Sequence, residues 1–228
     1  LSRCDWSSDV CSSDLDSGIA IEYNIPQTSK RVDFIISGFD HHDDPNIVII
    51  ELKQWDKINA IEGQDGLVET YTGNTMRKVV HPSYQAWSYS MMIKDYNSSV
   101  QTNNVQLWSC AYLHNYRRKP DDDLDKPQYE EYLKDSPAFT RGEVPQLREF
   151  IKRCIRKGDN KELIYQIDQG RIRPSKSLQN AITSMLKGNK EFIMLDEQKV
   201  VYEEILLTSR KCMEDNKKRT IIVTGGPG

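Results

Sequence analysis

"NIVIIELKQW" (residues 46–55) carries the strongest indication of the fold in this chain. Its four consecutive β-branched residues, Ile47 to Ile50, predict a strand that is covered on both faces and therefore lies near the centre of a sheet. The run ends in Glu51 and Lys53, which are two residues apart and so project from the same face. Ionised groups at the end of a buried strand are costly unless they pair or bind a metal. This strand therefore predicts both the sheet and a polar site at its end.

Two further strands precede this one. Residues 18–25 alternate in polarity, and residues 31–38 form a second alternating run, with turn-forming residues 26–30 between them. The pattern predicts an antiparallel hairpin. In the second strand we expect Val32, Phe34 and Ile36 on one face and Asp33, Ile35 and Ser37 on the other. The loop from this strand to the run at 47–53 is short, so we expect the two strands to be antiparallel neighbours.

The rest of the chain mixes strands and helices. We expect two short strands joined through Gly73-Asn74, a helix over 81–95 with Pro82 in its first turn, a strand over 104–113, and a charged, proline-rich loop with one short helix over 117–145. An amphipathic helix over 146–158 places Leu147, Phe150, Ile151 and Cys154 on one face and ends at Gly158, and more helix follows to about residue 186. After a break at 187–191 we expect a long helix capped by Asp196, and then a strand that runs into Gly225.

Composition places the chain among ordinary globular proteins. Its 228 residues are 37% hydrophobic and 29% charged, the net charge is −3, and the mean hydropathy is −0.67. No stretch approaches the roughly 20 apolar residues of a membrane span, so we expect no membrane association. Residues 1–15 resemble a translated sequencing adapter at "DVCSSDL" (9–15), and we exclude them from the fold; the alternative is a disordered tail. The remaining Cys110, Cys154 and Cys212 have no metal-ligand spacing and favour a reducing, cytoplasmic compartment.

The residues at the end of the central strand suggest chemistry on phosphodiesters. Asp33 and Glu51 offer carboxylate oxygens from adjacent strands, and the backbone carbonyl of Leu52 offers a third ligand for Mg²⁺ or Mn²⁺. Such a metal lowers the pKa of a bound water, and Lys53 would orient that water or stabilise developing negative charge. The simpler alternative is a Glu–Lys pair at a strand edge, since the same spacing recurs at Glu197 and Lys199 without a buried strand before it.

Asp33, followed by Glu51-Leu52-Lys53, resembles the motif of the PD-(D/E)xK nuclease superfamily, which has the restriction-endonuclease-like fold. "QAWSY" resembles the Gln-x-x-x-Tyr pair that many members carry on the helix after the core sheet, here Gln85 and Tyr89. The resemblance implies a mixed α/β sheet flanked by helices over residues 16–186. It also implies that Gln85 and Tyr89 face the active site and position DNA or RNA.

The C-terminal residues 187–228 resemble the start of a superfamily 1 helicase domain. Gln198 lies in a segment similar to the adenine-reading Q motif, and the strand into Gly225, Gly226, Pro227 and Gly228 resembles the beginning of a phosphate-binding loop. The loop's Lys and Ser/Thr would lie beyond residue 228, so we expect no ATPase or helicase activity from these residues alone. Residues 18–228 together resemble bacterial Schlafen group 3-like DNA/RNA helicase proteins, which implies ATP binding in the full-length protein.

Three functions remain open from the sequence. The first is a metal-dependent nuclease coupled to a helicase motor, and the second is a non-catalytic module that docks the motor on nucleic acid. The third makes the chain a lead-in to a nucleoside triphosphatase without activity of its own. Residues 148–176 carry nine Lys or Arg against four Asp or Glu. They either contact phosphates or form a solvated helix face.

Overall fold

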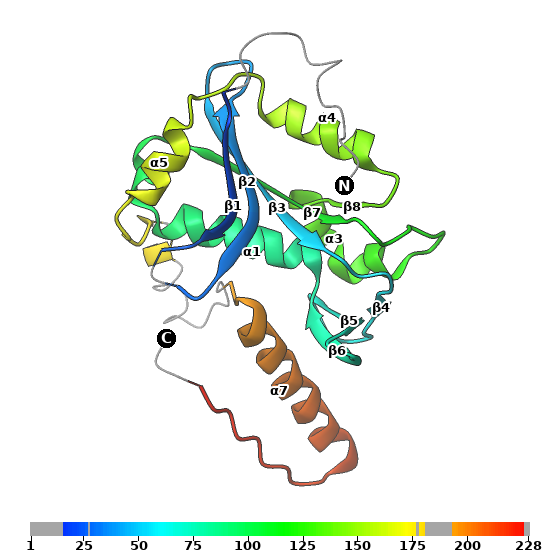
Figure 1. Cartoon of the computed structure of the whole chain (residues 1–228). Coiled ribbons are helices and arrows are strands. Elements are labelled where there is room, and N and C mark those ends of the chain that lie inside the picture. The colour runs from blue at the N-terminus through cyan, green and yellow to red at the C-terminus, as the bar shows by residue number, and fades with distance from the viewer. Residues whose placement is uncertain (1–15, 27, 177, 181–192, 226–228) are drawn as a thin grey trace.

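The computed structural model describes residues 16–26, 28–176, 178–180 and 193–225, and its core is a mixed five-stranded sheet (Figure 1). The strand order is β1-β2-β3-β7-β8. β1 pairs with β2 and β2 with β3 in antiparallel fashion, whereas β3 with β7 and β7 with β8 are parallel. The expected mixed α/β class is thus confirmed. The five strands are β1 (Gly18–Asn24), β2 (Arg31–Phe39), β3 (Pro45–Lys53), β7 (Gln106–Leu113) and β8 (Ala138–Thr140).

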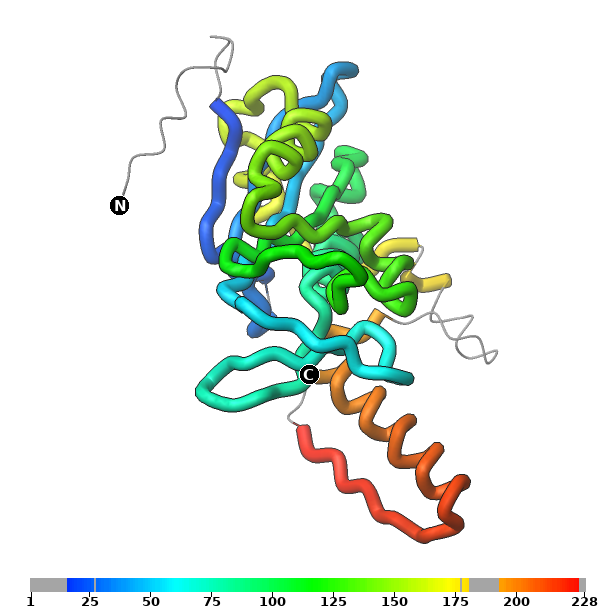
Figure 2. Tube along the Cα trace, turned by 90° about the vertical axis from the view of Figure 1, so that its right-hand side faces the viewer, coloured from blue at the N-terminus to red at the C-terminus, as the bar shows by residue number. Residues whose placement is uncertain are grey.

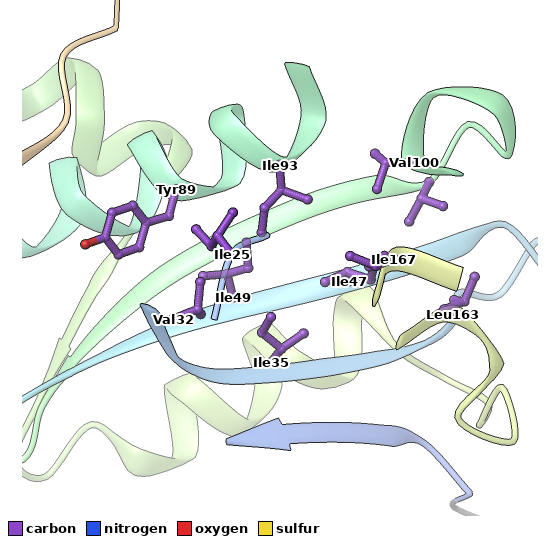
Figure 3. Close-up of a cluster of buried hydrophobic side chains, with 11 residues drawn as sticks. Ile25, Val32, Ile35, Ile47, Ile49, Tyr89, Ile93, Val100, Leu163 and Ile167 are labelled. Atoms are coloured by element: carbon purple, nitrogen blue, oxygen red, sulfur yellow. The ribbon is translucent and has the colours of Figure 1, made fainter. Parts of the chain in front are cut away.

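β3 lies at the middle of the sheet because both of its faces are covered. Ile47 and Ile49 pack in a cluster with α1 (Pro82–Tyr96), α2 (Ser98–Thr102) and α5 (Glu162–Asp168), part of which is seen in Figure 3. Val48 and Ile50 pack on the other face against α4 (Val144–Cys154). Each fully buried side chain of this kind stabilises the fold by about 1.5–3 kcal/mol. The prediction of a central, doubly covered strand is confirmed.

A second, three-stranded sheet lies beside the first. It consists of β4 (Asn59–Ala60), β5 (Leu67–Thr72) and β6 (Thr75–Val80). The turn between β5 and β6 is Gly73-Asn74, where both residues have positive φ, as a tight hairpin of this twist requires. The segment after β7 packs against this sheet through the short helices η1 (Asp123–Asp125), η2 (Pro127–Tyr129) and α3 (Glu130–Asp135).

His81 fixes the start of α1. It is fully buried, and its Nδ1 accepts a hydrogen bond from the backbone N–H of Ser83 at 3.1 Å. Its Nε2 lies 3.0 Å from the carbonyl oxygen of Leu124. Because Nδ1 accepts, the ring proton is on Nε2 and is donated to Leu124. A neutral histidine therefore caps the helix and ties it to η1, and Pro82 occupies the first turn as expected.

Asp159 connects β1, β2 and α5. It is 3% exposed, and its carboxylate accepts hydrogen bonds from the backbone N–H of Gly18 and of Leu163, and from the hydroxyl of Ser37. These donors come from three elements that are distant in sequence. One buried carboxylate therefore holds the edge of the sheet against the helix.

The last helix, α7 (Asp196–Asp215), extends away from the five-stranded sheet and runs beside β6 (Figures 1 and 2). Lys199, 7% exposed, pairs with Asp65 at 2.8 Å and with Glu203 at 3.2 Å. The hydroxyl of Tyr84 donates to the carbonyl of Met194 at 2.6 Å, just before the helix. No helix among the described residues is long and apolar enough to cross a bilayer.

Two expectations about strands are wrong. Val32 packs with Ile35 rather than with Phe34 and Ile36, because regular pairing of β2 lapses at Asp33, opposite Glu22, whose φ is 54°. The charged loop 117–145 contains the strand β8, which the sequence did not indicate. At three residues it is too short to show a periodicity, and it exists because β7 offers it an edge.

Two helix predictions also need correction. α4 ends at Cys154, not Gly158, because the backbone of Arg156 and Lys157 turns to hydrogen-bond with Phe39 at the end of β2. A Cβ at Gly38 would lie 2.4 Å from the carbonyl oxygen of Lys157, so this approach requires glycine. Beyond α5, residues 169–175 are not helical, since this segment hydrogen-bonds to the C-terminal end of α1 instead. Residues 181–186 lie outside the described part.

The C-terminal segment departs from prediction at both ends. Asp196 is the first residue of α7 rather than its cap. Residues 219–225 form no strand, and Ile222 is 82% exposed. A strand needs a hydrogen-bonding neighbour, and none of the described residues pairs with this segment.

Candidate functional site

The site begins where β2 and β3 part. Their antiparallel register runs from Phe39 opposite Pro45 to Phe34 opposite Ile50. Beyond this pair, the side-chain Oδ2 of Asp33 accepts a hydrogen bond from the backbone N–H of Leu52 at 2.9 Å. The Asp33 carboxylate thus replaces a backbone acceptor of the β2–β3 pairing. It is held beside the end of the central strand, close enough for its charge to act on Glu51.

Glu51 is the most buried charged group at this point. It is 3% exposed, and its Oε1 lies 2.7 Å from the Lys53 ammonium. Its Oε2 is buried and has no hydrogen-bond partner. Burial raises the pKa of Glu51 to about 7, Lys53 opposes that shift, and the charges of Asp33 and Asp196 add to it. An unpaired buried carboxylate oxygen is costly and suits a cation.

The Lys53 side chain lies beside Glu51, close to the protein surface. It is 15% exposed, and its ammonium lies 5.2 Å from the centroid of the Trp55 ring. The ammonium thus contacts both the face of the Trp55 ring and the Glu51 carboxylate. Lys53 therefore places an ammonium group next to the buried carboxylate of Glu51.

Gln85 and Tyr89 approach the site from α1. They lie one helical turn apart, and Gln85 Nε2 donates to the Tyr89 hydroxyl oxygen at 3.1 Å. The Tyr89 ring packs at the margin of the core cluster, with its hydroxyl pointing away from the aliphatic side chains (Figure 3). Burial, with the adjacent Asp196, raises the pKa of the phenol, so Tyr89 stays protonated and acts as a donor.

Lys30 and Asp196 complete the site, although the sequence analysis predicted neither of them as a site residue. The Tyr89 hydroxyl donates to Asp196 Oδ2 at 2.7 Å, and the Lys30 ammonium lies 2.9 Å from the same oxygen. Lys30 also pairs with Glu197 at 2.6 Å. Burial lowers the pKa of Lys30, but its two carboxylate partners outweigh this and raise it. No local pattern marks these residues, because 166 positions separate them in the sequence.

The donor set at the end of β3 has the chemistry of a hard-cation site. Asp33 and Glu51 supply carboxylates, and Leu52 supplies a backbone carbonyl. No three His, Cys, Asp or Glu side chains of the described residues form a group that could hold a metal ion. A metal here would therefore depend on two carboxylates together with backbone and water oxygens. The unpaired Oε2 of Glu51 is the observation that fits such an ion.

The residues expected to bind nucleotide lie elsewhere. Gln198 Oε1 accepts the backbone N–H of Leu195 at 3.1 Å, so in this structure its side chain caps α7. Gly225 is exposed and in irregular backbone. Gly226, Pro227 and Gly228 lie outside the described residues.

The basic stretch 148–176 is divided between the two faces of the sheet, since α5 packs on the α1 face and α4 on the other. α4, which carries its first cations, covers the face of the sheet where Val48 and Ile50 lie, whereas Glu51 is on the α1 face. Direct contact between those cations and a substrate bound at Glu51 would require the substrate to pass around the sheet.

No family model, curated protein or solved structure matches this chain.

Proposed function

We propose that this chain is a metal-dependent nuclease domain that hydrolyses phosphodiester bonds of DNA or RNA. One observation carries the proposal. Glu51 is buried with an unpaired oxygen, next to Asp33 and 2.7 Å from Lys53, at the point where two central strands part. This cluster matches the polar constellation of the PD-(D/E)xK motif that the sequence resembles. Most buried polar atoms in proteins have a hydrogen-bond partner, so an unpaired buried oxygen is unusual for a simple structural ion pair.

Each residue has a proposed role. Asp33, Glu51 and the Leu52 carbonyl would hold Mg²⁺ or Mn²⁺, which supplies a water of lowered pKa and neutralises phosphate charge. The Lys53 ammonium stabilises negative charge that develops on the phosphodiester or orients the attacking water. Gln85 holds the Tyr89 hydroxyl, which donates a hydrogen bond to the substrate.

The wider setting rests on the resemblance. In a full-length protein this domain would be coupled to an ATP-driven helicase motor that begins near Gly225, with Gln198 released from its capping role to read adenine. We propose a cytoplasmic location, supported by the buried, unpaired thiols of Cys110 and Cys154.

The test is cleavage of labelled single- and double-stranded DNA and RNA by the full chain, in Mg²⁺, in Mn²⁺ and in EDTA. We expect cleavage that needs the metal and falls by at least about a hundredfold in Glu51→Gln and in Lys53→Met, since one positioned charge contributes roughly 10²–10³ to the rate. Glu204→Gln is the matched control. It removes one carboxylate from α7, where Glu204 pairs with Lys78 at 2.5 Å, and it should cut like the unmodified chain.

Two outcomes contradict the proposal. Cleavage that persists in both site variants would place the chemistry elsewhere. Absence of cleavage by the unmodified chain, with oligonucleotide binding equal in all variants, would favour the non-catalytic docking module.

A further inference from the structure

Lys30 and Tyr89 converge on a single anionic group. Asp196 Oδ2 receives the Tyr89 hydroxyl at 2.7 Å and the Lys30 ammonium at 2.9 Å. The two donors come from the turn before β2 and from the middle of α1, and Gln85 fixes the phenol from the other side. The site is enclosed, because Lys30 is 18% and Asp196 is 14% exposed in its side chain. A cation and a fixed hydroxyl on one oxygen are the elements of an anion site.

We propose that Lys30 and Tyr89 form a subsite for a backbone phosphate of the nucleic acid, and that Asp196 occupies this subsite in the structure. The inference rests on the proposed function, since it takes nucleic acid as the ligand. It adds Lys30 to the residues that contact the substrate. It also makes Asp196 a competitor of the substrate phosphate for this subsite.

Asp196 fits the subsite poorly. Its second oxygen, Oδ1, is buried without a hydrogen-bond partner, a condition that costs free energy. Its φ is 31°, in the left-handed region that residues with a side chain adopt at a cost. Both conditions are relieved when the aspartate leaves the site.

Displacing Asp196 does not require α7 to detach. The chain is held just before the helix by Tyr84, which binds the carbonyl of Met194. One turn into the helix, Lys199 holds it through Asp65 and Glu203. The movement is therefore confined to the first turn between these two anchors, where Glu197 also pairs with Lys30, and a substitution at 196 should leave the helix in place.

The test is binding of fluorescein-labelled 20-nucleotide oligo(dT) and oligo(U) to the full chain, measured by fluorescence anisotropy in EDTA so that cleavage plays no part. Asp196→Asn keeps the shape of the side chain and removes its charge. We expect this variant to bind the oligonucleotide about tenfold more tightly. A change of this size follows when the charged carboxylate of Asp196 no longer competes with the phosphate for Lys30 and Tyr89. Adding Lys30→Gln to Asp196→Asn should reverse the gain, and Glu204→Gln should leave binding within about twofold of the unmodified chain.

Unchanged or weaker binding by folded Asp196→Asn would overturn the proposal, as would a gain that survives Lys30→Gln. A second measurement needs no variant. Saturating oligonucleotide in EDTA should increase amide hydrogen exchange at residues 196–199 and leave residues 206–212 unchanged, and protection at 196–199 would also overturn it. Absence of cleavage by the unmodified chain, together with tighter oligonucleotide binding by Asp196→Asn, would reject the nuclease and keep the subsite. Cleavage by the unmodified chain, without tighter binding by Asp196→Asn, would keep the nuclease and reject the subsite.

Discussion

His81 should make the stability of this protein fall in mildly acidic solution. The ring is fully buried, and its Nδ1 is already an acceptor for the Ser83 N–H. Burial lowers its pKa from 6.5 to about 4, although the hydrogen bond to Leu124 opposes the shift. The unfolded chain therefore binds this proton more readily than the native protein does. Stability is complete above about pH 6.5 and decreases as the pH falls from there toward 4.

The magnitude follows from the two pKa values. At pH 5 an unfolded histidine with a pKa of about 6.5 is almost fully protonated, whereas native His81 is still mostly neutral. The gap of about 1.5 pH units below the unfolded pKa corresponds to about 2 kcal/mol of unfolding free energy. This is a large part of the roughly 5–15 kcal/mol that stabilises a typical domain.

The assay is urea unfolding followed by tryptophan fluorescence at pH 7 and pH 5, for the unmodified chain and for His81→Asn. Carboxylates also titrate in this range, so the relevant quantity is the difference between the two proteins in their loss of stability. We expect His81→Asn to lose about 2 kcal/mol less than the unmodified chain. His42→Asn, in an exposed loop, is the control and should lose as much as the unmodified chain. Equal losses in all three proteins would refute the reasoning.

Two further predictions concern buried groups. Asp159→Ala should lower the free energy of unfolding by about 3 kcal/mol or more, because it leaves three buried donors without an acceptor; Glu149→Ala, at an exposed position, should change it by less than about 0.5 kcal/mol in the same urea titration. Alkylation with iodoacetamide followed by mass spectrometry should modify half-exposed Cys212 well before Cys110 and Cys154, since both are buried and burial raises their thiol pKa. Faster reaction of Cys110 than of Cys212 would show that the core opens readily.

The sequence was most informative where a pattern is long and local. The apolar run of β3, the Gly73-Asn74 turn and the Pro82 helix start each depend on neighbours within a few residues, and each is confirmed. The short strand β8 exists only because β7 offers it an edge. The segment at 219–225 has the residues of a strand but no strand beside it.

In the candidate site, too, some contacts follow from local spacing and others depend on tertiary packing. Glu51 and Lys53 lie on one strand face, and Gln85 and Tyr89 on one helix face, so spacing alone places each pair together. Lys30 and Asp196 meet through tertiary packing of a turn and a distant helix. The early end of α4 has a similar cause, since backbone bonds to Phe39 override a helical pattern that continues to Gly158.

The central position of β3 also has a consequence for how this protein folds during its synthesis. Its antiparallel neighbour β2 precedes it by a short loop, but β7 begins at Gln106, 53 residues after Lys53. At about 5–20 residues per second, a ribosome needs roughly 3–10 s to supply it. Throughout that interval one edge of the run Ile47–Ile50 has no partner, and such a segment is a template for aggregation. Substitutions that slow the docking of β7 should therefore appear first as a loss of soluble yield, before any change in the finished molecule.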